Sequence, residues 1–191
     1  ASNSIRCIAE DEQGNYYIGT SDALSIVTIS NGLKVRKTLQ EIMYARSIAI
    51  GKAGDVAVVN NSGQLFIINN QMIKETFTLK TGNAETFYTC CKYMDNGDLL
   101  VGTTTNEMYR LRKTNGKYRT IKRYTTGNLQ QISSIASDDQ GNYWVCSGSG
   151  IGYLQREKFH TFDTNTFNSS IDNMTMDYQG NLWFTSSRLG L

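Results

Sequence analysis

The sequence of 191 residues contains no proline and only one histidine, His160. Average usage would place proline at roughly 5% of positions. One histidine and four cysteines, with no Cys-x-x-Cys spacing, do not make the ligand sets that zinc needs. We therefore expect no metal, no cofactor and no histidine-based catalytic cluster.

Strong net charge and long apolar runs are also missing. The formal charge is +2 at pH 7, and hydrophobic residues make up 39% of the chain. A nearly neutral chain has no electrostatic footprint for nucleic acid. Its apolar runs are far shorter than the roughly 20 residues of a membrane-spanning helix, and no signal peptide opens the chain. If the parent protein is exported or bound to a membrane, we expect those segments to lie outside these 191 residues.

A sustained helical period is missing as well, whereas the 17 glycines fit many tight turns. The stretch 137–154, SDDQGNYWVCSGSGIGYL, shows the typical unit. Asp138 can accept a backbone N–H two residues on, and Gly141 tolerates the positive φ at the end of the turn. Three consecutive apolar residues, 143–145, then predict a strand covered on both faces. The sequence therefore predicts an all-β chain.

This unit occurs five times. The turn glycines, spaced by 40, 43, 44 and 39 residues, are Gly14, Gly54, Gly97, Gly141 and Gly180. Six residues before each glycine stands a first apolar column, Ile8, Ile48, Cys91, Ile135 and Met174. Three and four residues after it stand a second column, Tyr17, Ala57, Leu100, Trp144 and Trp183, and a third, Ile18, Val58, Val101, Val145 and Phe184. Each column predicts one buried position used five times.

A period near 40 with strand-type units is typical of four-stranded β-propeller blades. The first copy predicts strands at 4–10, 15–20, 24–29 and 33–39, and the next three copies each predict four more. The fifth copy supplies two, at 171–176 and 181–186. Eighteen strands make about 4.5 blades. We therefore expect residues 1–191 to form a single β-propeller fragment, an open arc or part of a larger propeller.

Three copies, EDEQGNYYIGT, SDDQGNYWVCS and DYQGNLWFTS, resemble the two-component regulator propeller repeat. The matching positions include Asp11, Gly14 and Asn15, then Asp138, Gly141, Asn142 and Trp144, and then Asp177, Gly180, Asn181 and Trp183. The second copy departs most, since Ala57 and Val59 replace the aromatic residue and the glycine. Cys146 also stands where the family has glycine.

The resemblance implies a ligand-sensing, extracytoplasmic (periplasmic or cell-surface) module of a bacterial membrane receptor. The output domain would be a histidine kinase, often hybrid with a response regulator, or a diguanylate cyclase. The module itself would be non-catalytic, and its ligand would be a glycan or another small molecule. A protein-interaction scaffold and a fragment of a propeller lyase or hydrolase stay open as alternatives. Fold alone does not decide among these functions.

Other candidate residues have structural explanations. His160 alternates with two phenylalanines on a predicted strand, which favours a structural or exposed role. The carboxylates Asp11, Asp138 and Asp177 repeat at turn positions, where hydrogen bonds to the backbone explain them. Tyr17, Trp144 and Trp183 favour packing between blades over sugar stacking, with a predicted cost of about 3–5 kcal/mol for replacing either tryptophan by alanine. No ligand-binding residue is predicted.

The remaining candidate residues are the cysteines and a run of basic residues. Cys91 belongs to the first apolar column, and no two cysteines have positions that favour a disulfide, so we expect four free thiols. The basic run is expected to be a solvated outer edge; it comprises Arg110, Arg112, Lys113, Lys117, Arg119, Lys122 and Arg123. An arc leaves unpaired strand edges and blade faces, which predicts self-association.

Overall fold

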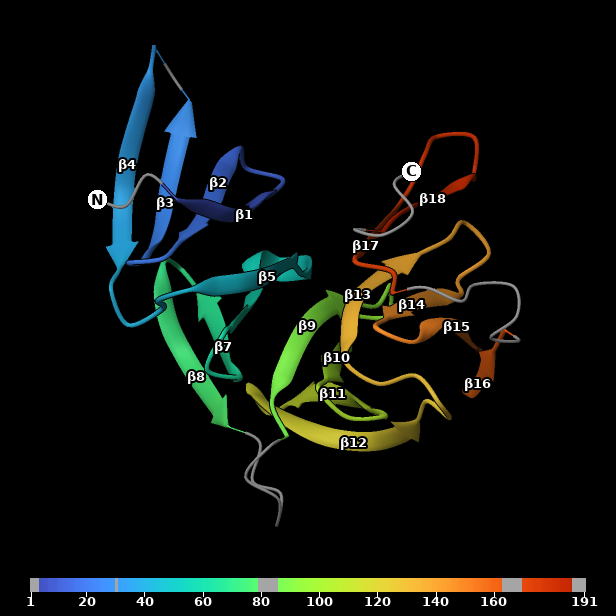
Figure 1. The fold of residues 1–191 in the computed structure, drawn as a ribbon. Coiled ribbons are helices and arrows are strands. Elements are labelled where there is room, and N and C mark those ends of the chain that lie inside the picture. The colour runs from blue at the N-terminus through green and yellow to red at the C-terminus, as the bar shows by residue number, and fades with distance from the viewer. Residues whose placement is uncertain (1–3, 30, 79–85, 163–169, 187–191) are drawn as a thin grey trace. The chain divides into compact units, whose positions relative to one another are not determined.

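The computed structural model describes residues 4–29, 31–78, 86–162 and 170–186. The predicted all-β class is confirmed (Figure 1), since the described residues hold 18 strands and one 3-10 turn, η1 (Lys52–Gly54). The strand ends lie within two residues of their predicted positions, so the turn glycines and apolar columns located the strands well.

The chain forms two compact units, Ala1–Tyr93 and Met94–Leu191. The strands of the first unit are β1 (Ile5–Glu10), β2 (Asn15–Thr20), β3 (Leu24–Ile29), β4 (Leu33–Leu39), β5 (Ala45–Ile50), β6 (Val56–Asn60), β7 (Gln64–Asn69), β8 (Met72–Thr78) and β9 (Tyr88–Tyr93). Those of the second are β10 (Leu99–Thr103), β11 (Glu107–Thr114), β12 (Lys117–Thr125), β13 (Ile132–Ser137), β14 (Tyr143–Ser147), β15 (Gly150–Gln155), β16 (Lys158–Thr161), β17 (Asn173–Met176) and β18 (Leu182–Thr185).

Four sheets have four strands and one has two. Their orders are β1-β2-β3-β4, β5-β6-β7-β8, β12-β11-β10-β9, β13-β14-β15-β16 and β17-β18. Within each sheet, neighbouring strands are consecutive along the chain. This is the up-and-down arrangement of a propeller blade, repeated four and a half times.

The turn between the first two strands of each sheet follows from its glycine. All five turn glycines have φ between 75° and 85°, a left-handed conformation that costs a residue with a Cβ roughly 1–2 kcal/mol. The Gly14 N–H donates to the Asp11 carbonyl at 3.0 Å, and Gly180 donates to the Asp177 carbonyl at 3.1 Å. The same residue type therefore sets the same turn in each sheet.

The cross-strand register places the apolar columns on two faces. The first and third columns are direct partners, as in Ile48↔Val58 and Met174↔Phe184. The second column lies on the opposite face, because successive residues of a strand alternate between faces. We call the two faces of each sheet the first-column face and the second-column face.

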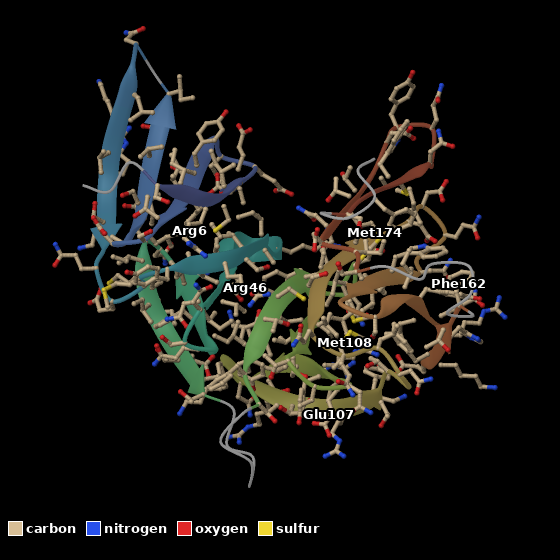
Figure 2. The ribbon with its side chains drawn as sticks, viewed as in Figure 1. Arg6, Arg46, Glu107, Met108, Phe162 and Met174 are labelled. Atoms are coloured by element: carbon tan, nitrogen blue, oxygen red, sulfur yellow. The ribbon has the colours of Figure 1, made fainter. Side chains whose placement is uncertain are left out.

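In the core of the first unit, the second-column face of the first sheet packs against the first-column face of the second sheet. Tyr17 and Ile26 of the second-column face of the first sheet pack with Val58 and Phe66 of the second sheet, and Ile48 packs against the same cluster. In the second unit, Trp144 and Cys146 pack with Met174 of β17 (Figure 2) and with Phe184. In both units, the second-column face of one sheet covers the first-column face of the next.

Two column members depart from the predicted burial. Ile8 is 60% exposed and Trp183 is 51% exposed, so the prediction that Trp183 is buried between blades is wrong. The reason is that Ile8 lies on the first-column face of the first sheet and Trp183 on the second-column face of the last. No described residue buries either side chain. Trp144 is half-buried, and Tyr17 is buried as expected.

Candidate functional site

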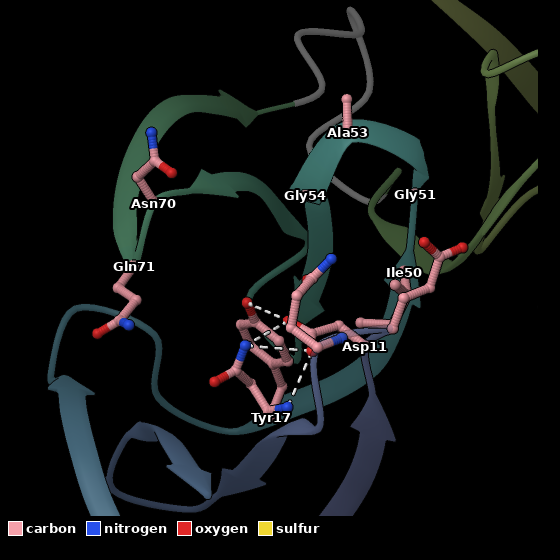
Figure 3. Close-up of a pocket in the computed structure, with 11 residues that line it drawn as sticks. Asp11, Tyr17, Ile50, Gly51, Ala53, Gly54, Asn70 and Gln71 are labelled. Carbon is pink, nitrogen blue, oxygen red and sulfur yellow. Dashed lines mark hydrogen bonds between the residues drawn. The ribbon is translucent and has the colours of Figure 1, made fainter.

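A polar pocket of about 450 Å³ lies in the first unit, among the turns of its first two sheets (Figure 3). Its size falls in the range of small-molecule sites. The lining residues come from the β1–β2 turn, β2, the β5–β6 turn and the β7–β8 turn; they are Asp11, Glu12, Gln13, Asn15, Tyr17, Ile50, Gly51, Ala53, Gly54, Asn70 and Gln71.

Asp11 fixes one wall of the pocket. Its Oδ1 accepts the backbone N–H groups of Gln13 at 3.0 Å and Asn15 at 2.9 Å. The Asn15 side-chain amide donates to Oδ2 at 2.9 Å, and the Tyr17 hydroxyl donates to Oδ2 at 3.4 Å. Asp11 is buried, so these donors supply what water would otherwise provide. Asp11 therefore accepts hydrogen bonds from the backbone of its own turn.

Tyr17 stays protonated at every physiological pH. Burial and the Asp11 carboxylate beside it raise the pKa of Tyr17 to about 12. The phenol is therefore a permanent donor that points at Asp11, as Figure 3 shows. It cannot serve as a general base near neutral pH.

The opposite wall consists of two turns with left-handed backbone. Ala53 and Gly54 have φ of 59° and 75°, while Asn70 and Gln71 have φ of 50° and 57°. The neighbouring Asn69 amide joins the two turns by donating to the Ala53 carbonyl at 3.2 Å and to Asp55 Oδ1 at 2.7 Å. Asn70 and Gln71 themselves have exposed side chains.

The pocket can form many hydrogen bonds, but its lining has no positive charge. The side chains of Glu12, Gln13, Asn70 and Gln71 are exposed and carry donors and acceptors suited to hydroxyl groups. Of the residues that line it, none is Lys, Arg or His. The one buried carboxylate, Asp11, is already held by its own turn. This arrangement favours binding over proton transfer.

The tryptophans have a role that the sequence analysis missed. Trp144 Nε1 donates to Asp138 Oδ2 at 2.8 Å, and Trp183 Nε1 donates to Asp177 Oδ2 at 2.9 Å. Each indole thus ties the second strand of its sheet to the turn before it, as the Tyr17 hydroxyl does in the first sheet. The constant spacing of six residues between Asp and the aromatic residue was the available signal.

These bonds control the acidity of the turn carboxylates. Burial opposes ionisation of Asp138, but hydrogen bonds from Trp144 and Asn142 outweigh it and keep the pKa of Asp138 below its usual value. Hydrogen bonds from Trp183 and Asn181 lower the pKa of Asp177 to about 2. Both carboxylates are therefore ionised turn acceptors. The remaining repeat positions, Gly97, Gly141 and Gly180, lie at their turns with positive φ.

The basic hairpin β11–β12 is only partly the solvated edge that we predicted. Arg110 is buried, and its Nε donates to Asp98 Oδ2 at 2.6 Å, while its Nη1 pairs with Glu157. Arg112 also binds Asp98, and Lys122 binds Glu157 at 2.8 Å. The prediction was wrong for Arg110, because Asp98 on the neighbouring turn and Glu157 compensate its charge.

His160 and the cysteines stand outside the pocket. His160 is exposed on β16, and its ring stacks on Tyr153 with centroids 4.9 Å apart. All four cysteines are free. Burial raises the pKa of Cys91 to about 12 and that of Cys7 to about 11, so both are neutral thiols. Among the described residues, no group of three His, Cys, Asp or Glu side chains is placed to hold a metal ion.

The fold belongs to the class of proteins built from repeated four-stranded antiparallel sheets. A family model supports the resemblance to the two-component regulator propeller repeat. The model described as "Two component regulator propeller" matches residues 1–22. This match contains β1, the Asp11–Gly14 turn and β2, so it confirms the resemblance in the first copy. None of the curated proteins matches the chain.

Solved structures share the fold over almost the whole chain. The extracellular domain of the hybrid two component system BT3049 of B. thetaiotaomicron, so described, has a TM-score of 0.79 at 20% identity; the match covers 97% of this chain and 27% of that one. The extracellular domain described as that of the one component system BT4673, from the same organism, has 0.69 at 17%, with 96% and 28% covered.

An enzyme has the same fold. Virginiamycin B lyase of Staphylococcus aureus has a TM-score of 0.77 at 18% identity, with 96% of this chain and 63% of that chain covered. The present chain thus spans between 27% and 63% of the length of these three proteins. Among the described residues, no helix has the length and apolar character that a membrane crossing requires.

Proposed function

We propose that the chain is a non-catalytic, ligand-sensing propeller module from the extracytoplasmic part of a bacterial membrane receptor, of the two-component or diguanylate cyclase type. The extracellular domains described above supply the analogy of fold, and the first repeat supplies the analogy of sequence. The observation that carries the proposal is the polar pocket with its held carboxylate and exposed amides.

The chemistry of the pocket narrows the ligand class. A neutral, hydroxyl-rich small molecule, such as an uncharged oligosaccharide, can exchange hydrogen bonds with Gln13, Asn70 and Gln71. Ligands bearing carboxylate, sulfate or phosphate would face Asp11 and Glu12 without a compensating cation. We therefore propose a neutral glycan or polyol in place of an acidic one.

A thermal-shift screen with two matched panels, neutral and acidic oligosaccharides, tests this proposal. Binding raises the melting temperature by mass action, and we expect increases only in the neutral panel. Gln13→Ala should abolish the increase. Gln140→Ala is the control, because Gln140 occupies the same turn position in the fourth copy and donates the same backbone N–H to its aspartate. Equal loss in both variants, or shifts only with acidic sugars, would refute the pocket assignment.

Lyase activity is the second candidate, favoured by the similarity to virginiamycin B lyase. The single histidine lies on β16 and is engaged with Tyr153, and it does not line the pocket. If the chain were a lyase that acts through this residue, His160→Ala would abolish turnover of virginiamycin B. We expect no turnover in either form.

A further inference from the structure

A second pocket, of about 320 Å³, lies among the turns of the third and fourth sheets. Its lining comes from the β9–β10 turn, β11, the β13–β14 turn, β14, and the end of β15 with the turn that follows. None of its residues belongs to the first or the last sheet. Its volume falls in the range of small-molecule sites.

The second pocket corresponds in position to the polar pocket of Figure 3. Each is formed by the first turn of one sheet, the first turn of the next sheet and the last turn of that next sheet. The strand register places Arg156 where the second sheet has Asn70, and the two residues have φ of 44° and 50°. The second pocket therefore has a guanidinium where the polar pocket has a neutral amide.

Arg156 gives the second pocket a positive charge that no other side chain compensates. Its side chain is exposed, and it forms no hydrogen bond or ion pair with any residue that the structure describes. Its left-handed φ is a conformation that Asn adopts more readily than a long side chain. An unpaired guanidinium at the wall of a pocket is suited to binding an anion, because its N–H groups form charge-assisted hydrogen bonds.

Tyr143 supplies a second hydrogen-bond donor. Its side chain is only 5% exposed, and its hydroxyl oxygen accepts the backbone N–H of Asp95 at 3.0 Å. Within the described ranges of the chain, the hydroxyl proton itself has no acceptor. Burial raises the pKa of Tyr143, so this proton is present at neutral pH. Because buried polar groups are normally satisfied, the phenol is available to donate to a bound molecule.

The remaining lining combines compensated charge with apolar surface. The ionic network beside the pocket contains three cations and two carboxylates: Arg110, Arg112, Lys122, Asp98 and Glu157. Asp95, which also lines the pocket, offsets the one surplus positive charge. Arg156 then leaves a net charge of +1. Met94 and Leu154 supply the apolar part of the lining.

We propose that the second pocket binds a small organic carboxylate with an apolar body, such as an aromatic carboxylate. The carboxylate accepts hydrogen bonds from the Arg156 guanidinium and the Tyr143 hydroxyl, and the apolar body lies against Met94 and Leu154. Guanidinium and carboxylate groups match in shape, since two parallel N–H···O bonds can join them. An acidic oligosaccharide has no apolar body, so this site does not alter the selectivity proposed for the polar pocket.

A titration with benzoate, followed by two-dimensional amide NMR spectra, tests this proposal. We expect saturable shifts at the amide of Asp95, which donates to the Tyr143 hydroxyl, and at the amide of Gly141 in the lining. Benzamide has the same ring without the charge and should cause no such shifts. Acetate has the charge without the ring and should bind about tenfold more weakly than benzoate.

Two variants and one control locate the site. Arg156→Asn introduces the residue type that the second sheet has at this turn position, so the turn is kept while the charge is lost. It should weaken benzoate binding by about tenfold or more, and Tyr143→Phe should weaken it by about fivefold. Arg119→Asn is the control, since Arg119 is an exposed arginine on β12 that does not line the pocket. It should bind benzoate like the wild type.

The absence of saturable shifts with benzoate overturns the proposal. Equal shifts with benzamide would show that the carboxylate is not recognised, and equal affinity for acetate would show that the apolar lining has no role. Both results contradict the proposed ligand class. Benzoate binding that survives Arg156→Asn, or that Arg119→Asn weakens equally, contradicts the proposed site.

Discussion

At the scale of single residues, the aspartate of each turn organises more than its turn. In the fourth sheet, Asp138 accepts the N–H of Gln140, both amide groups of Asn142 and the indole of Trp144. One carboxylate therefore joins the turn to the strand that follows. The Asp and Gly positions predicted the turn. The second apolar column was identified by apolar character alone, so it did not reveal that the indole of Trp144 donates a hydrogen bond.

Trp144→Phe tests this bond. The ring remains, but the donor to Asp138 is lost, and a hydrogen bond to a charged group is worth about 1.5–3 kcal/mol. We expect a loss of this size in the free energy of unfolding, measured with urea. Trp183→Phe is the matched variant, with the same bond to Asp177 on an exposed indole. It should cost about 1 kcal/mol or less, since water replaces the donor; equal costs would mean that burial does not strengthen the bond.

At the scale of elements, ion pairs and hydrogen bonds to one carboxylate join the third and fourth sheets. Glu157, in the β15–β16 turn, accepts bonds from Lys122 at 2.8 Å and from the Tyr124 hydroxyl at 2.7 Å on β12, and it pairs with Arg110 on β11. Lys122 above all, then Tyr124 and Arg110, lower the pKa of Glu157 from 4.5 to about 2 against the opposing effect of burial. The turn is thereby tied to the basic hairpin.

This ionisation makes stability depend on pH. Because the pKa of Glu157 is lower in the folded chain, its contribution is complete above about pH 4.5 and disappears as the pH falls towards 2. The difference in unfolding free energy between the wild type and Glu157→Gln should therefore be constant above that pH and shrink below it. Glu41→Gln, at an exposed position between β4 and β5, is the control. A difference that stays the same down to pH 2 would show that Glu157 forms no such pairs.

The strands themselves were predictable, but the pocket was not. Turn glycines and alternating apolar residues locate strands because both act locally. The pocket wall made by Asn70 and Gln71 depends on bringing the β7–β8 turn of one sheet near the β1–β2 turn of another. Arg110 was wrongly predicted to be solvated because its burial also depends on a distant segment. Its partner Glu157 lies 47 residues further along the chain.

At the scale of the whole molecule, the sheets follow one packing rule. A second-column face covers the first-column face of the next sheet wherever the described clusters show the contact. The sequence predicted burial for every column member, and the structure corrects this at Ile8 and Trp183, because a column gives the average of five copies and not the surroundings of each. The same rule is the packing of neighbouring blades in a propeller.

A double-mutant cycle between Trp144→Ala and Met174→Ala tests this rule most directly. Side chains that share a cluster couple by about 0.5–3 kcal/mol, whereas independent sites are additive to about 0.3–0.5 kcal/mol. The control pairs Trp144→Ala with Met108→Ala, a buried methionine on the second-column face of β11, in a different sheet from Trp144 and outside the cluster that contains Met174. The rule predicts coupling above 0.5 kcal/mol for Trp144 with Met174 and near-additivity for Trp144 with Met108. Additivity in the first pair would contradict it.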